Sequence, residues 1–179
     1  RTKALNIYAP GIGAHMSFRS ATTALCVMSL ANLPDSDKTN KALQRSVKYL
    51  LAIAPKIRRV DGRWVCNNWS HAYIIRALLK VRKKKQFLVN RHKIDVTIKE
   101  QIIKLKNYTY VDGGWGYYDF KHQTNIPSGN PTSFITATVL IALKEAQLAG
   151  FELPSVVIKK ALKQLRLQRK PDDSFLYSN

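Results

Sequence analysis

The sequence contains few acidic residues, two cysteines and no long apolar run, and each shortage excludes a class of protein. Its 179 residues include 11 Asp and Glu against 30 Lys and Arg, a formal net charge of +19. Cys26 and Cys66 are too few for a disulfide framework and lack the spacing of a metal-binding pair, so we expect two buried, reduced thiols. No segment approaches the ~18 uninterrupted apolar residues that cross a bilayer.

The chain has the length and composition of one folded domain covering residues 1–179. A hydrophobic content of 45% argues against a disordered protein. The sequence begins "RTKALNIYAP", with neither Met nor a signal-peptide pattern, so we expect a fragment of a longer protein.

The excess positive charge predicts an anionic partner, which is an acidic macromolecule or an anionic membrane surface. The densest basic run is "KVRKKKQFLVNRHK", residues 80–93. It has two interpretations, a docking patch for membrane or nucleic acid and a solvated linker between helices. The linker is favoured, and nucleic acid is disfavoured as a partner, because aromatic residues are sparse in the run and no nucleic-acid motif is present.

Clusters of Gly, Pro, Asn and Asp divide the chain into six helical windows of two alternating types. Residues 18–33, 69–81 and 133–149 are apolar on nearly all sides, which is typical of buried inner helices. Residues 40–54, 95–109 and 155–168 have one apolar face, which is typical of outer helices. The order predicts an all-α fold of three inner–outer hairpins, with Asp37 as the N-cap of the first outer helix.

A similar loop follows each outer helix. The three copies are "VDGRW" (60–64), "VDGGWGYYDF" (111–120) and "PDDSFLY" (171–177). Asp-Gly favours a tight turn in which Gly takes a positive φ. We expect the aromatic residue that follows to fill the gap between successive hairpins. The corresponding residues are Asp61, Asp112 and Asp172, and then Trp64, Trp115 and Phe175.

A helical hairpin that ends in Asp-Gly-x-Trp resembles the prenyltransferase and squalene-oxidase repeat. The resemblance covers nearly the whole chain and is strongest in "DGGWGYYDF", "PSGNPTSFITATVLIALKEA" and "LRLQRKPDDSFLYS"; it points most to uncharacterised bacterial members. It implies the α/α toroid of terpenoid cyclases and prenyltransferase β-subunits, here complete or partial, with inner helices around a cavity. In those enzymes the cavity binds an isoprenoid.

The catalytic motifs of these enzymes are incomplete in this chain. The closest match to the Asp-x-Asp-Asp motif of squalene–hopene cyclases is "DSDK", residues 35–38, where Lys38 replaces the last Asp. The Asp-x-Cys of the prenyltransferase zinc site does not occur. The resemblance therefore implies an isoprenoid or other hydrophobic ligand without metal or cofactor, and carbocation cyclisation or prenyl transfer if the domain is an enzyme.

Three residues are candidates for catalysis. Asp112 and Asp119 flank the glycine-aromatic loop and would form an acid pair if they converge. Alternatively, Asp112 makes the turn and Asp119 starts the next loop or binds a lysine. His71 near the start of an inner helix is either an acid–base group or a structural histidine. Ser70 cannot act with it as a dyad, because consecutive residues of a helix do not face each other.

Aromatic and polar residues near the expected cavity are candidates for ligand binding. Trp115, Tyr117 and Tyr118 lie in the loop, where rings suit a carbocation or a stacked sugar. The remaining candidates, at the starts of inner helices, are Trp69, Phe134 and Thr136. Two other functions stay open: a non-catalytic binding or scaffold module with a basic face, and a carbohydrate-active toroid.

Overall fold

The computed structural model describes residues 12–57, 68–116 and 131–178, and this part of the chain is all-helical. It holds six α-helices and two short 3₁₀ helices. They are α1 (Ile12–Leu30), α2 (Asp37–Ile53), η1 (Ala54–Lys56), α3 (Asn68–Val81), η2 (Lys85–Asn90), α4 (Arg91–Asn107), α5 (Ser133–Leu148) and α6 (Ser155–Gln168). The predicted all-α class and the six helical windows are confirmed.

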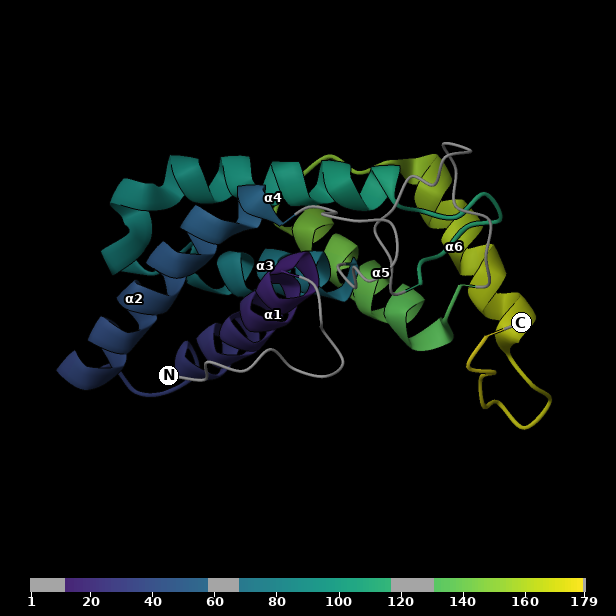
Figure 1. The fold of residues 1–179 in the computed structure, drawn as a ribbon, viewed down its shortest axis with the longest axis horizontal. Helices are drawn as coiled ribbons and strands as arrows, with labels where there is room; N and C mark the ends of the chain where they lie inside the picture. Colours follow the sequence, from purple (N-terminus) through teal and green to yellow (C-terminus); the bar gives the residue numbers. More distant parts are fainter. Residues whose placement is uncertain (1–11, 58–67, 117–130, 179) are drawn as a thin grey trace.

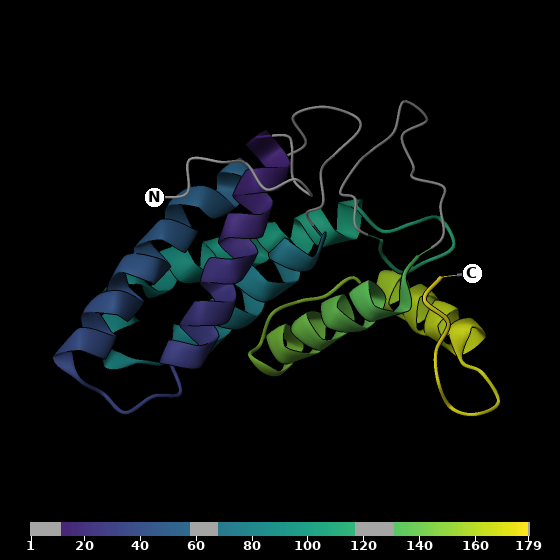
Figure 2. The same cartoon turned by 60° about the horizontal axis from the view of Figure 1, so that its bottom comes forward.

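The helices form three hairpins in series (Figure 1). Helix α1 packs on α3, and α3 packs on α5, while α2, α4 and α6 each pack on the helix that precedes them. Figure 2 shows α1 and α5 on either side of α3. The described helices form an open series with α2 and α6 at its two ends, so the toroid stays a prediction.

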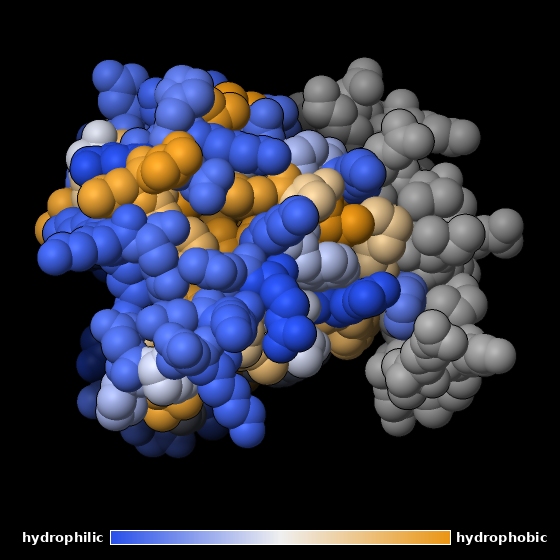
Figure 3. Space-filling view, turned by 90° about the vertical axis from the view of Figure 1, so that its left-hand side faces the viewer, coloured by the Kyte–Doolittle hydropathy of each residue, from blue (hydrophilic) through white to orange (hydrophobic). Residues whose placement is uncertain are grey.

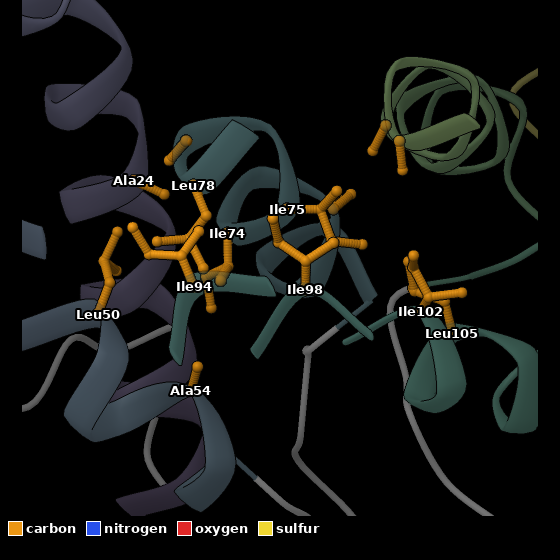
Figure 4. Close-up of a cluster of buried hydrophobic side chains, with 14 of the residues drawn as sticks. Ala24, Leu50, Ala54, Ile74, Ile75, Leu78, Ile94, Ile98, Ile102 and Leu105 are labelled. Atoms are coloured by element: carbon orange, nitrogen blue, oxygen red, sulfur yellow. The ribbon is translucent and has the colours of Figure 1, made fainter. Parts of the chain in front are cut away.

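The inner and outer helices differ in how many of their sides are buried. Helix α3 is buried on most of its sides, because apolar residues lie nearly all round the helix. One side of α3 stays partly exposed to solvent. Helix α2 buries only Leu43, Val47, Leu50 and Leu51, which lie on one side. Figure 4 shows the core where α1, α2, α3 and α4 meet, with Leu50, Ile74 and Ile98 among its side chains.

The second and third loop copies have the same backbone hydrogen bonds. In the second, Gly113 N donates to Tyr110 O and Tyr110 N donates to Gly114 O, both at 3.0 Å. In the third, Asp173 N donates to Lys170 O (3.0 Å) and Lys170 N donates to Ser174 O (2.8 Å). Gly113 has φ +97° and Asp173 has φ +64°, and Asp is one of the few side chains that tolerates this region. The equivalence of these two loops is confirmed.

The aromatic residues of these loops have different surroundings. Trp115 is fully buried between two hairpins, with its Nε1 donating to Leu105 O of α4 at 2.8 Å. Phe175, in contrast, is 50% exposed. The predicted gap-filling role therefore holds for Trp115. The first copy, residues 60–64, lies outside the described residues.

Two local predictions were wrong. Ser36, not Asp37, is the N-cap of α2, since its Oγ accepts a hydrogen bond from Thr39 N at 3.2 Å. Cys26 is exposed rather than buried. Cys66 lies outside the described residues.

A matched pair of glycines tests the loop geometry. Gly113 and Gly150 both have positive φ, but a Cβ on Gly113 would lie 2.6 Å from the Lys160 carbonyl, whereas a Cβ on Gly150 would meet nothing within 4 Å. We expect Gly150→Ala to lower the free energy of unfolding by about 1 kcal/mol and Gly113→Ala by about 3 kcal/mol or more, measured by urea denaturation. Equal losses would contradict the close approach of the loop to α6.

Candidate functional site

The open sides of α1, α3 and α5 form one continuous surface, here called the inner face. The residues that α3 contributes are three or four positions apart, so they lie on one side of the helix. The apolar residues that α5 contributes are seven positions apart, which is about two helical turns. Figure 2 looks toward this surface, with α3 between α1 and α5. Its members are Phe18 and Leu25 of α1, Trp69, Tyr73, Arg76 and Lys80 of α3, and Phe134, Ile141, Glu145 and Leu148 of α5.

Aromatic rings gather where these three helices begin. The Phe18 and Trp69 rings meet edge to face with centroids 4.8 Å apart, which joins α1 to α3. The Trp69 and Tyr73 rings are 6.2 Å apart, and the Phe134 ring is 5.7 Å from that of Tyr177. Trp69 and Phe134, two of the predicted ligand-binding residues, therefore belong to the aromatic end of the inner face.

A cleft of about 530 Å³ lies where α1, α3 and α5 end. Its apolar lining includes Met28, Leu79 and Leu148, and its charged lining includes Arg76, Lys80, Lys83 and Glu145. The Arg76 guanidinium donates two hydrogen bonds of 2.9 Å to the Glu145 carboxylate, which joins α3 to α5. Lys80 and Lys83 add positive charge that this pair does not neutralise, so the cleft suits an anionic group beside an apolar one.

His71 lies on a different side of α3, toward α4. It is fully buried, and its Nδ1 is 2.7 Å from Gln101 Oε1, so the ring donates through Nδ1. Nε2 has no hydrogen-bond partner in the described structure. The pKa of His71 is lowered from 6.5 to about 3, first by burial and then by the nearby Lys104 ammonium, while the hydrogen bond to Gln101 opposes both. The imidazole is therefore neutral at pH 7 and has no access to the inner face.

The Lys104 ammonium bridges two outer helices. Its Nζ donates to Ala54 O and to Ile57 O, both at 3.0 Å, at the end of α2 and η1. A cation at these carbonyls is favourable, because carbonyl groups at the end of a helix carry partial negative charge. The same ammonium acts on His71, which links the histidine's neutral state to the packing of α4 against α2.

Trp115 and Thr136 hold the second loop against α5. Thr136 Oγ1 accepts a hydrogen bond from Trp115 N at 3.0 Å and donates to Trp115 O at 3.2 Å. Both residues are fully buried. Asp112, in the same loop, is exposed. Tyr117, Tyr118 and Asp119 lie outside the described residues, so the acid pair and the aromatic platform stay predictions.

Sequence reasoning missed the charged end of the inner face. Arg76 and Lys80 interrupt an otherwise apolar window at a spacing of one turn, which is a signal for a single open face. Phe134, Ile141 and Leu148 repeat every seven residues on α5 and mark its open face in the same way. Across the described ranges, no Asp or Glu side chain is buried and no group of His, Cys, Asp or Glu is placed to hold a metal ion.

The low pKa of His71 predicts how the free energy of unfolding depends on pH. The unfolded chain takes up a proton near the ordinary His pKa of 6.5, whereas folded His71 does so only near 3, so stability falls as the pH drops through this window. Between pH 6.5 and 5 we expect a loss of about 2 kcal/mol. Urea denaturation should show this loss in the native chain and in His92→Asn, an exposed control, but not in His71→Phe. An unchanged slope in His71→Phe would refute the assignment.

Comparisons with protein-family models, curated proteins and solved structures found no match. The resemblance to the prenyltransferase and squalene-oxidase repeat therefore rests on the motifs of the sequence. The part of the chain that the structure describes is all-helical, and its inner face has an aromatic end and a charged end.

Proposed function

We propose that this domain binds an elongated apolar ligand with an anionic head along its inner face, and that an isoprenoid diphosphate is representative of the class. The observation that carries the proposal is the polarity of the inner face. Aromatic rings lie at one end, and a cleft with surplus positive charge lies at the other.

The apolar part of such a ligand would lie along α3 and α5. Tyr73 and Trp69 are only partly buried, and Phe134, Ile141 and Leu148 are exposed, so apolar area remains for a ligand to cover. Covering it is favourable by about 25 cal/mol per Å² of apolar surface. Aromatic faces would also stabilise the branched, unsaturated chain of an isoprenoid by close packing.

The anionic head would lie in the cleft. Glu145 engages Arg76, which leaves Lys80 and Lys83 to attract a phosphate group. The apolar side chains of Met28 and Leu148 line the same cleft. The lysines would therefore contact the anionic head of the ligand, and these apolar side chains would contact the first carbons of its hydrocarbon chain.

Binding is a better match to this surface than catalysis. A cyclase needs an acid in a closed, desolvated cavity, and the carboxylates of the described residues lie at least partly in solvent. Glu145 is the acid on the inner face, and it is held by Arg76. The proposal is therefore a binding domain, in which the neutral, buried His71 has a structural role.

Two ligands, one without and one with an anionic head, separate the apolar and the anionic contributions to the binding affinity. Farnesol and farnesyl diphosphate would be titrated into the protein by calorimetry. Tyr73→Ala together with Phe134→Ala removes two inner-face rings, so affinity for both probes should fall about 10-fold or more. Lys80→Gln together with Lys83→Gln should weaken farnesyl diphosphate several-fold and leave farnesol unchanged.

Lys99→Gln together with Lys106→Gln is the matched control. It removes the same charge from exposed positions of α4 and should change neither titration. If this control weakens farnesyl diphosphate as much as the cleft variant, the attraction comes from net charge alone. Failure of both probes to bind the native protein would reject the proposal.

A further inference from the structure

The turn between α3 and α4 presents apolar side chains to solvent. It contains η2, whose Phe87 is buried and anchors the turn in the core. The next two side chains point outward, with Leu88 51% exposed and Val89 95% exposed. Val89 is the most exposed large hydrophobic residue in the described structure. Single exposed apolar residues are ordinary on a protein surface. Two adjacent exposed apolar residues in one turn are a candidate contact site for a membrane or another molecule.

Positive charge surrounds this apolar pair. Residues 83–93 contain Lys83, Lys84, Lys85, Arg91 and Lys93 and no acidic residue. The nearest acid is Asp35, whose carboxylate lies 3.6 Å from Lys84 Nζ and is largely exposed, so it offsets one charge weakly. Asp95 lies farther along α4 and is engaged by Arg82. We call residues 83–93 the basic turn.

The start of α2 extends the basic turn. Gln86 accepts a hydrogen bond from Gln44 Nε2 at 3.4 Å and donates one to Asn40 Oδ1 at 3.3 Å, which fixes η2 beside α2. A shallow depression of about 330 Å³ on this part of α2 is lined by Lys38, Lys41, Gln44 and Arg45. Figure 3 looks at this end of the molecule and shows a mostly hydrophilic surface with apolar patches between the polar side chains.

We propose that the basic turn docks the domain on an anionic lipid bilayer, with Leu88 and Val89 inserted below the headgroups and the surrounding lysines bound to them. An exposed apolar pair within a ring of cations matches the two layers of a bilayer surface, the anionic headgroups and the acyl chains beneath them. No helix in the described residues has the length and apolar character to span a bilayer.

A bilayer fits the pair better than nucleic acid does. Nucleic acid is bound by cations together with stacking aromatic rings or hydrogen-bonding side chains aimed at bases. The exposed side chains at the tip are aliphatic, and the one aromatic residue of the turn, Phe87, is buried. The docking surface also adjoins the inner-face cleft, since Lys83 belongs to both. The docking surface itself does not depend on the ligand proposed for the inner face.

Vesicle sedimentation tests this docking. The probes are vesicles of phosphatidylcholine alone and of phosphatidylcholine mixed with phosphatidylserine, at low and at physiological salt. The native protein should sediment with the mixed vesicles and lose affinity as salt rises. Lys83→Gln with Lys84→Gln and Lys85→Gln should weaken binding about 100-fold at low salt. Leu88→Ser with Val89→Ser should weaken it about 10-fold or more, and this loss should persist at physiological salt.

Helix α6 supplies a matched control for each variant. Lys159→Gln with Lys160→Gln and Lys163→Gln removes equal charge, and Leu162→Ser with Leu167→Ser removes an exposed apolar pair. Both controls should retain native affinity within about 3-fold. All altered side chains are partly or fully exposed, and circular dichroism would verify that each variant is folded.

Two outcomes would overturn the proposal. Equal losses in the α6 and basic-turn variants would mean that net charge alone attracts the protein to the vesicles. The second outcome is tight binding to duplex DNA or RNA in a gel-shift assay that the Lys83–Lys85 substitutions abolish, with vesicle binding unaffected. That result would assign the basic turn to nucleic acid.

Discussion

The burial of α3 is the constraint on which the rest of the structure depends. Within the described chain it is the helix that packs on both other inner helices and on its own outer helix. Ile74, Ile75 and Leu78 are fully buried in these contacts, so each neighbour covers a different side of α3. Removal of this apolar surface from water supplies the main driving force that holds the three hairpins together. One side of α3 stays open, and that side is the centre of the inner face.

The polar start of α3 determines how its neighbours are placed. Asn68 Nδ2 donates to Gly116 O at 2.9 Å, Ser70 Oγ accepts from Ser17 Oγ at 2.9 Å, and His71 pairs with Gln101. Three residues of one helical turn thus bind the second loop, α1 and α4 in turn. A buried polar group is costly without its partner, so these bonds favour one register of the hairpins over others. The same burial keeps His71 neutral and gives it a structural role.

The two proposed surfaces follow from this layout. Because α1, α3 and α5 run in parallel in the series, their beginnings gather the aromatic rings and their ends gather the cleft with Lys80 and Lys83. The turn that leaves α3 begins at the cleft and carries the basic turn with Leu88 and Val89. A domain docked through this turn would hold the charged end of its inner face close to the membrane, where apolar ligands with anionic heads reside.

The sequence by itself determined the helices, their inner and outer character and the repeated turn, because these depend on local periodicity and backbone preference. The sequence aligns Asp112 with Asp172, and the residues that follow these two, Gly113 and Asp173, share positive φ and the same hydrogen bonds. Only the tertiary structure decided which of the equivalent residues in the repeated loops and helices are buried by neighbouring elements. Trp115 is buried while Phe175 is half exposed, and Cys26 is exposed, because burial depends on which elements pack over each position. The Arg76–Glu145 pair likewise joins residues far apart in the chain, and no local pattern connects them.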